Sequence, residues 1–418
     1  MRFDTNPGDT LLEVPVANLR IGMYVAGLDR PWLETPFMVQ GFYIRGAEDA
    51  GRVAEYCEFV FVDPRRFERP TVVAQAATDV GTRRKAIVSK KAATPKDTPL
   101  GVSFKDEYLT AKDDFKSAGE AVARVFETLK KGGHLDVVGV KKAIDPLIDS
   151  VLRNRDALAA LIRMSKKDSY AYTHAISTAV WSVLLGRHLG FDKPALQTLA
   201  LGSALLDIGK VKFPDDLLTK EESLTEDETA LVREHVECSL SMIKQADARI
   251  APAVLEVIRD HHERHDGSGY PRGLAGNDIP LTARIAGMAD SYDAMTTARP
   301  YAPARSSFQA MQEFNDLKDV KFQGELVEQF MQAIGLFPTG SLVELNTGEV
   351  GIVAAQNSTR RLRPKVMVVL DGDKKPYRSP GIVDLFGDVS NGGMTAGVWI
   401  VRELAPGFYG LEAEDYYL

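Results

Sequence analysis

The stretch from His261 to Pro271 constrains the fold of this chain more than any other feature of its sequence. It reads HHERHDGSGYP, two adjacent imidazoles followed by a glycine-rich turn. Upstream, Val254, Val257 and Ile258 recur at helical spacing, which predicts a packed helix that leads into the histidines. Neighbouring side chains on a helix diverge by ~100°, so the pair can share an ion only if the helix ends there. The alternative is a helix tip that carries two solvated histidines.

Composition indicates a globular protein without a nucleic-acid or membrane function. The 418 residues are enough for two or three domains, and 44% hydrophobic with 26% charged residues is ordinary for a globular chain. A net charge of −7 argues against general nucleic-acid binding. Cys57 and Cys238 are the only cysteines, so neither a disulfide framework nor a cysteine metal site is expected. The sequence has no run of about 18 apolar residues and no signal-peptide core, which predicts a cytoplasmic protein without a membrane span.

Changes in hydrophobic period along the chain predict a mainly α protein with small β-rich regions at both ends. Residues 1–70 show partial alternation and a short buried-strand run at Phe59–Val62, as expected of a small β-rich domain. Residues 71–104 lose this periodicity and are rich in alanine, threonine, lysine and arginine, so a basic flexible linker explains them better than a nucleic-acid arm does. Residues 105–335 carry helical stripes, and residues 336–418 return to a period of two, which predicts a β-rich appendage.

The helical region is expected to form an all-α bundle. A capping box at Thr225 and Glu228 marks the start of one helix, and another helix is expected to run from Asp192 to Lys210. Six side chains with ligand atoms fall on several of these helices, as metal sites in helix bundles require. They are His174, Asp207, His235, His261, His262 and Asp290.

These six side chains form a mixed nitrogen and oxygen set that suits a pair of divalent metal ions such as Mn, Fe or Zn. For any single histidine, a hydrogen-bonded core imidazole is the simpler interpretation; for the six together it is not. The other three histidines are interpreted as incidental. They are His134 in a loop, His188 near a helix C-terminus, where a cation is favoured, and His265 on the surface.

Several ordered motifs within residues 165–335 resemble the HD-GYP family, a branch of the HD metal-dependent phosphohydrolases that cleave the bacterial second messenger cyclic di-GMP. The whole stretch from His261 to Pro271 takes part in this resemblance. The other matching residues are His174, Asp207-Ile208-Gly209-Lys210, Lys220 with Leu224-Thr225, His235, Ile279-Pro280, Arg284-Ile285, Asp290 and Arg299-Pro300-Tyr301. Near the N-terminus, the stretch Pro15–Val25 resembles the small domain of unknown function that often precedes HD-GYP modules; an unrelated β-rich sensor is the alternative.

The resemblance implies a role for each matching side chain at the site. The implied metal ligands are Asp207 as the bridge between two ions, His174 and Asp290 for one ion, and His235, His261 and His262 for the other. The implied catalytic residues are Asp207 and Lys210, because two bridged cations ~3.5–4 Å apart stabilise attacking and leaving oxygens and the lysine stabilises phosphate charge. The implied substrate-binding residues are Lys210, Gly269, Tyr270, Pro271 and Arg299.

The chain departs from the family pattern at two positions. Leu206 stands where the family has the histidine of its His-Asp pair, so the ion held by His174 and Asp290 is expected to lose a nitrogen ligand and to bind more weakly. Tyr170 stands where some members have a glutamate that supports a third ion, so a trinuclear site is not expected.

Two functions follow from this resemblance. One is a phosphodiesterase that opens cyclic di-GMP to the linear dinucleotide pGpG, and in a further step to GMP. The other is a degenerate member that acts as a receptor for cyclic di-GMP or as a protein-interaction module without turnover. The enzyme is preferred because three ligands and a water can still complete the site next to Leu206. Other signalling proteins are candidate partners, and we allow for a homodimer.

Overall fold

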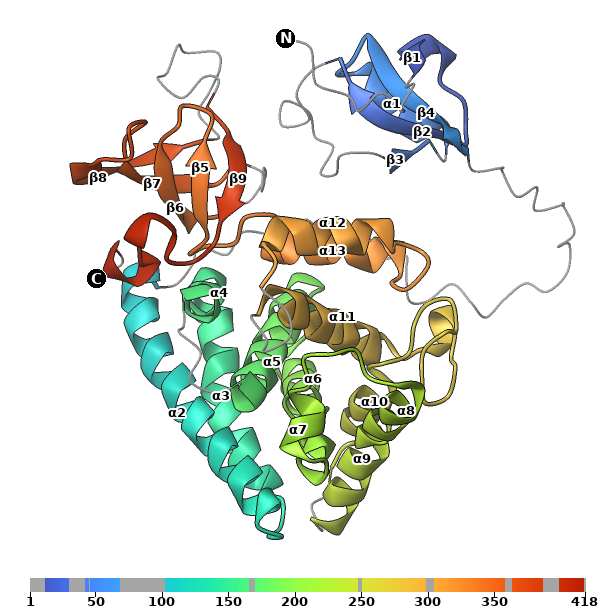
Figure 1. Cartoon of the computed structure of the whole chain (residues 1–418), viewed down its shortest axis with the longest axis vertical. Coiled ribbons are helices and arrows are strands. Elements are labelled where there is room, and N and C mark those ends of the chain that lie inside the picture. Colours follow the sequence, from blue (N-terminus) through green and yellow to red (C-terminus); the bar gives the residue numbers. More distant parts are fainter. Residues whose placement is uncertain are drawn as a thin grey trace, which may run out of the picture. The chain divides into compact units, whose positions relative to one another are not determined.

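The computed structural model describes residues 12–29, 42–44, 46–67, 102–164, 170–246, 250–297, 304–357, 363–385 and 398–416 (Figure 1). The chain divides into two compact units, Met1–Thr94 and Pro95–Leu418. Most of the linker predicted over 71–104 lies outside the described residues.

The N-terminal unit is built on a four-stranded antiparallel sheet in the order β1-β4-β2-β3. Its elements are β1 (Leu12–Pro15), the 3₁₀ turn η1 (Val16–Asn18), β2 (Met23–Leu28), β3 (Phe42–Tyr43), α1 (Ala47–Ala54) and β4 (Phe59–Phe67). Val25 and Val60 of the sheet are fully buried with Val53 of α1 in one small core. The predicted β-rich N-terminal region is therefore confirmed, and the buried-strand run at Phe59–Val62 forms part of β4.

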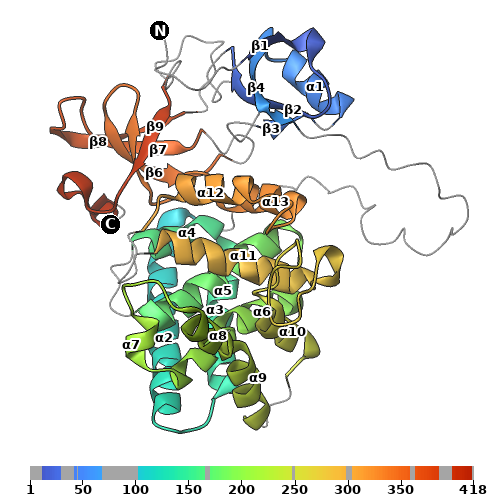
Figure 2. The ribbon, with the colours of Figure 1, turned by 45° about the vertical axis from the view of Figure 1, so that its right-hand side comes forward.

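A helical bundle makes up most of the second unit (Figures 1 and 2). Its elements are α2 (Phe104–Lys130), α3 (Val137–Arg153), α4 (Arg155–Met164), α5 (Tyr170–His188), α6 (Lys193–Leu205), η3 (Ile208–Lys212), α7 (Asp215–Leu218), α8 (Glu226–Arg233), α9 (His235–Gln245), α10 (Pro252–Asp260), η4 (Gly276–Asp278), α11 (Leu281–Thr296), α12 (Ser307–Asp316) and α13 (Gly324–Ile334). α5 packs against both α6 and α11. Trp181, Tyr292 and Phe330 are buried where α5, α11 and α13 meet, with neighbouring rings edge to face.

Local sequence signals set several of the helix ends. Thr225 accepts a hydrogen bond from the Glu228 amide and Glu228 accepts from the Thr225 amide, so the predicted capping box is confirmed at the start of α8. Two boundaries differ from expectation. The helix expected to reach Lys210 ends at Leu205 and continues as a 3₁₀ turn, and the helix that starts after Thr225 breaks before His235, where α9 begins.

The C-terminal part of the second unit is a five-stranded antiparallel sheet in the order β8-β7-β6-β5-β9. Its elements are β5 (Leu342–Leu345), β6 (Val350–Ala355), β7 (Lys365–Leu370), β8 (Pro376–Asp384), β9 (Ile400–Leu404) and the 3₁₀ turns η6 (Phe408–Gly410) and η7 (Ala413–Tyr416). Gly348, between β5 and β6, has φ = 81°, a left-handed conformation that favours glycine. The mainly helical fold class with a small sheet at each end is thus confirmed. Within the described residues, no helix is long and apolar enough to cross a membrane.

Candidate metal centre

The bundle brings together all six side chains that the sequence singled out as metal ligands. Five elements supply them: α5, the turn after α6, the start of α9, the end of α10, and α11 (Figure 2). They form two overlapping groups, and within each group one ligand atom per residue lies within 4.8 Å of the others. The larger group is Asp207, His235, His261 and His262, and the smaller is His174, Asp207 and Asp290.

The early end of α6 places Asp207 at the centre of this arrangement. Ser239 of α9 fixes the turn that follows, because its Oγ accepts from the Gly209 amide at 2.8 Å and donates to the Leu206 carbonyl at 3.0 Å. A Cβ at Gly209 would lie 2.1 Å from the His235 carbonyl oxygen, so only glycine lets the turn approach α9 so closely. Sequence reasoning did not identify Ser239, because a lone serine in a helix carries no recognisable signal.

Backbone carbonyls orient the rings of His235 and His261. Nδ1 of His235 donates to the Val232 carbonyl at 2.7 Å, and Nδ1 of His261 donates to the Ile258 carbonyl at 2.8 Å. In a neutral ring with hydrogen on Nδ1, Nε2 offers a lone pair. The Nε2 atoms of His235 and His261 lie 3.2 Å and 3.9 Å from Asp207 Oδ1. Each of these three atoms is a hydrogen-bond acceptor, and none of them can donate to another. Such an arrangement requires a cation or a proton between them.

Four buried polar atoms in the larger group have no hydrogen-bond partner among the described residues. They are Asp207 Oδ1 and the Nε2 atoms of His235, His261 and His262. Buried acceptors left unpaired are costly, at roughly 1–3 kcal/mol each. One divalent cation would satisfy all four, and three imidazole nitrogens with one carboxylate oxygen are ligands that Fe, Mn and Zn accept. The residues present therefore fit a metal ion.

Burial keeps the larger group in the form that binds metal. It lowers the pKa of His261 to about 4 and holds the pKa of His262 well below its usual value, so both rings are neutral at pH 7. Burial would raise the pKa of Asp207, but Lys210 and the nearby histidines outweigh it and hold that pKa well below its ordinary range. A charged carboxylate thus faces neutral imidazoles.

The smaller group is organised around His174. Its Nε2 lies 2.9 Å from Asp290 Oδ1 and 3.8 Å from Asp207 Oδ2, and its Nδ1 lies 2.7 Å from Asp293 Oδ2. Burial would lower the pKa of His174, but hydrogen bonds to Asp290 and Asp293 raise it to about 9. Carboxylates thus face both ring nitrogens, and they favour either a second proton on the ring or a cation at Nε2, where the resemblance expects a metal ion.

Asp293 is a supporting residue that the sequence analysis did not assign to the site. Its carboxylate also accepts from Trp181 Nε1 at 3.2 Å and from Thr297 Oγ1 at 3.3 Å, so its position is fixed from two sides. The available signal was its spacing of three residues from Asp290, which puts both carboxylates on one face of α11. Carboxylates that hold the second ring nitrogen of a ligand histidine are common at metal sites.

Leu206 is the position at which the smaller group lacks a ligand side chain. Its side chain is buried and has no ligand atom, so the smaller group has three ligands against four. Lys210 Nζ lies 2.5 Å from Asp207 Oδ2, the carboxylate oxygen that faces His174. An ammonium group thus lies beside the carboxylate on the side of the smaller group.

The turn at Gly269, Tyr270 and Pro271 is held against the histidines. The Tyr270 ring stacks on the His262 ring with centroids 4.6 Å apart. A Cβ at Gly269 would lie 2.4 Å from the His262 carbonyl oxygen, so a side chain is excluded there. Glu263 anchors the end of the turn by accepting from the Arg272 amide at 2.7 Å, which makes this wall of the site rigid.

The remaining predicted residues divide between the site and its surroundings. Arg299 lies outside the described residues, so its role stays a prediction. His134 is exposed, and His188 lies 3.0 Å from Gln329 Oε1, away from the ligand groups. The expectation that His265 is on the surface is wrong. Its ring is half-buried, because the loop that carries it folds back on residues 320–322.

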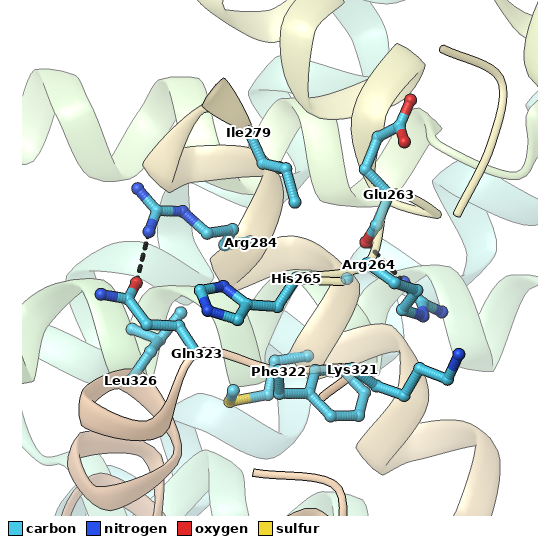
Figure 3. Close-up of a pocket in the computed structure, with 11 residues that line it drawn as sticks. Glu263, Arg264, His265, Ile279, Arg284, Lys321, Phe322, Gln323 and Leu326 are labelled. Atoms are coloured by element: carbon cyan, nitrogen blue, oxygen red, sulfur yellow. Dashed lines mark hydrogen bonds between the residues drawn. The ribbon is translucent and has the colours of Figure 1, made fainter. Parts of the chain in front are cut away.

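A pocket beside the histidine segment is distinct from the metal site (Figure 3). The His265 ring lies between Arg264 and a hydrogen-bonded pair of Arg284 and Gln323. Arg264 donates to the His261 carbonyl at 3.0 Å, so this region supports the backbone of the ligand segment. None of the six candidate ligands lines the pocket.

Comparison with known proteins gives three matched regions. An HD domain model matches residues 156–326, a domain of unknown function (DUF3391) matches residues 11–140, and a KOW domain associated with HD domain matches residues 342–390. The cyclic di-GMP phosphodiesterase PA4108 of Pseudomonas aeruginosa is 31% identical over 90% of this chain and 89% of its own length. A cyclic di-GMP phosphodiesterase of Thermotoga maritima is 31% identical over 40% of this chain and 45% of its own length. Among solved structures, an HDG"Y"P protein of Bdellovibrio bacteriovorus, Bd1817, is 17% identical with a TM-score of 0.46, covering 77% of this chain and 98% of its own.

Proposed function

The chain belongs to the HD domain family, with a DUF3391 domain before the HD domain and a KOW domain after it, and we propose that it is an HD-GYP phosphodiesterase that hydrolyses cyclic di-GMP. The observation that carries the proposal is the convergence of four buried, unpartnered ligand atoms on one point. The relative that is 31% identical over 90% of the chain bears the name of a cyclic di-GMP phosphodiesterase, which supports the same substrate.

The proposed cofactors are two divalent ions of iron, manganese or zinc. When bound, such ions supply an acidified water and stabilise charge on the attacked phosphate. Asp207 is the residue that both ligand groups share, so it is proposed as the bridge. Asp293 holds the His174 ring, and Ser239 holds the turn that carries Asp207. Lys210, which pairs with the Asp207 carboxylate, is proposed to neutralise negative charge on the phosphate of the substrate.

The substrate groove is proposed to run along the turn at Gly269, Tyr270 and Pro271. Hydrolysis of one phosphodiester bond of cyclic di-GMP gives the linear dinucleotide pGpG, and hydrolysis of the second gives GMP. The rigid packing of this turn on His262 supports a fixed wall next to the reacting phosphate. Arg299 remains a proposed second cation.

A second candidate function is a cyclic di-GMP receptor without turnover. Leu206 favours it, because the smaller ligand group has no fourth ligand and the Leu206 side chain, which has no ligand atom, is buried. The intact larger group would then hold one ion for nucleotide binding. The domain boundaries, cytoplasmic location, partner proteins and homodimer remain predictions.

Turnover by the full chain tests the proposal. The protein is purified without chelator, supplied with Mn²⁺ or Fe²⁺, and incubated with cyclic di-GMP, and pGpG and GMP are separated by chromatography. We expect cyclic di-GMP to be converted only when the metal is supplied. We also expect the Lys210→Ala variant to convert it more slowly. If calorimetry shows binding of cyclic di-GMP but no product forms, the receptor function is supported. If there is no binding and no product, both functions are excluded.

A further inference from the structure

One arginine outside the predicted ligand and phosphate set lies at the rim of the metal site. Arg233 is the last residue of α8, two positions before His235. Its guanidinium lies over the Tyr270 ring, 4.9 Å from the centroid. The side chain is exposed, and within the described part of the chain no carboxylate pairs with it.

The position of Arg233 is tied to the metal ligands on both sides. The Val232 carbonyl, one residue before it, accepts from His235 Nδ1. Tyr270 stacks on the His262 ring, with ring centroids 4.6 Å apart, and also contacts the Arg233 guanidinium. Tyr270 thus connects the larger ligand group to Arg233. A cation–π contact of this kind holds the guanidinium near the ring, and no hydrogen bond or ion pair among the described residues uses its N–H groups, which can therefore meet a ligand.

This geometry favours recognition of a base edge. His262 and Arg233 already contact the Tyr270 ring, which leaves less of that ring for an incoming base to stack on. The free edge of the guanidinium instead offers two parallel donors. Guanine presents two acceptors, O6 and N7, that match this fork, whereas adenine presents one acceptor beside a donor.

Resting on the proposed function, we propose that Arg233 binds the O6/N7 edge of a guanine in the cyclic dinucleotide and so sets the preference for guanine over adenine. The phosphate under attack lies at the metal ligands, and the base of the same nucleotide lies further out. Arg233 is exposed and contacts the ring that stacks on His262, so it lies at the rim of the ligand group. It acts on substrate choice, whereas Lys210 and the metal ligands act on the phosphate.

The test compares wild type, Arg233→Ala and Arg233→Lys as full chains with metal supplied. Arg124→Ala, which removes another exposed helical arginine on α2, is the matched control. KM and kcat are measured for cyclic di-GMP, and cyclic di-AMP is measured as a competitor through its inhibition constant. Metal content is measured for every variant.

We expect Arg233→Ala to raise KM for cyclic di-GMP roughly 10- to 100-fold, as loss of a bidentate base contact does, with kcat and metal content close to wild type. The inhibition constant of cyclic di-AMP should change little, so the preference for guanine collapses. Arg233→Lys should not restore it, because an ammonium group lacks the planar fork. Arg124→Ala should behave as wild type.

Three results would overturn the inference and leave the proposed function standing. They are an unchanged preference in Arg233→Ala, an equal loss for both dinucleotides, which indicates a phosphate contact, and full rescue by lysine, which indicates charge alone. Loss of metal in Arg233→Ala would overturn it as well, since Arg233 would then only support His262. A metal-loaded wild type that neither binds nor cleaves any cyclic dinucleotide would remove the proposed function together with the inference.

Discussion

At the scale of single residues, the metal site is defined by buried ligand atoms that have no hydrogen-bond partner among the described residues. Four histidines could be assigned to a site from sequence because they fall on several predicted helices, and two of them, His261 and His262, precede a glycine-rich turn. Their tautomers could not be assigned, because the accepting carbonyls of Val232 and Ile258 are set by local backbone geometry. Asp293 and Ser239 could not be assigned to the site from sequence, because they support it through contacts with residues that are distant along the chain.

Leu206 gives the sharpest residue-scale prediction. Leu206→His should place an imidazole next to Asp207, raise metal occupancy toward two ions per chain and increase cyclic di-GMP hydrolysis, most clearly at limiting metal. If the pocket has closed around leucine, the buried ring instead lacks a partner and costs roughly 1–3 kcal/mol of stability. Melting temperature, metal content and turnover are therefore measured on one preparation.

Leu206→Phe is the matched control for that experiment, since it adds a ring without a lone pair. Gain of metal in both variants would show that packing, not ligation, limits the site. A stable Leu206→His protein with two ions and no turnover would contradict the enzyme and favour the receptor.

At the scale of elements, helix ends decide where the ligands meet. The capping box at Thr225 was predictable because it is a local pattern of side chain and backbone. The breaks after Leu205 and before His235 were not, since apolar residues continue past both: Leu206 and Ile208 follow α6, and Val236 follows α8. Those breaks bring Asp207 and His235 together. The turn after Asp207 can approach α9 this closely because Gly209 has no side chain.

Gly209→Ala tests this role of the turn. The added Cβ would lie 2.1 Å from the His235 carbonyl oxygen and 2.6 Å from the Ser239 amide, so the turn must move away from α9. We expect a loss of roughly 1–3 kcal/mol in stability, as overpacking costs, and weaker metal binding because Asp207 moves with the turn. Thermal melting and metal titration measure the two effects.

Gly119→Ala in α2 is the control, because its Cβ would meet only Ile176 Cδ1 at 3.8 Å, an ordinary contact. Alanine is the better helix former, by up to about 1 kcal/mol, so this variant should be at least as stable as wild type. Wild-type melting and metal affinity in Gly209→Ala would show that the turn does not depend on this contact.

At the scale of the whole molecule, changes of hydrophobic period were enough to predict a helical bundle with a small sheet at each end. They could not predict how the C-terminal sheet joins the bundle. Glu403 of β9 forms a buried ion pair with Arg163 of α4 at 2.5 Å and also accepts from Ser341 Oγ at 3.1 Å. These partners are 240 and 62 residues away along the chain, beyond the reach of any local pattern.

Metal content measured on wild type, His262→Ala and His134→Ala tests whether the four unpaired ligand atoms hold a metal ion. His262 supplies one of the four orphaned ligand atoms, whereas His134 is an exposed loop histidine that controls for adventitious binding. Each full chain is purified without chelator, supplied with Mn²⁺ or Fe²⁺, desalted and analysed by elemental mass spectrometry. We predict at least one ion per chain in wild type and His134→Ala. His262→Ala should lose it, with an affinity that falls by more than the roughly 10- to 100-fold that loss of an outer-shell partner costs. Equal metal content in wild type and His262→Ala, or none in wild type, would contradict the account.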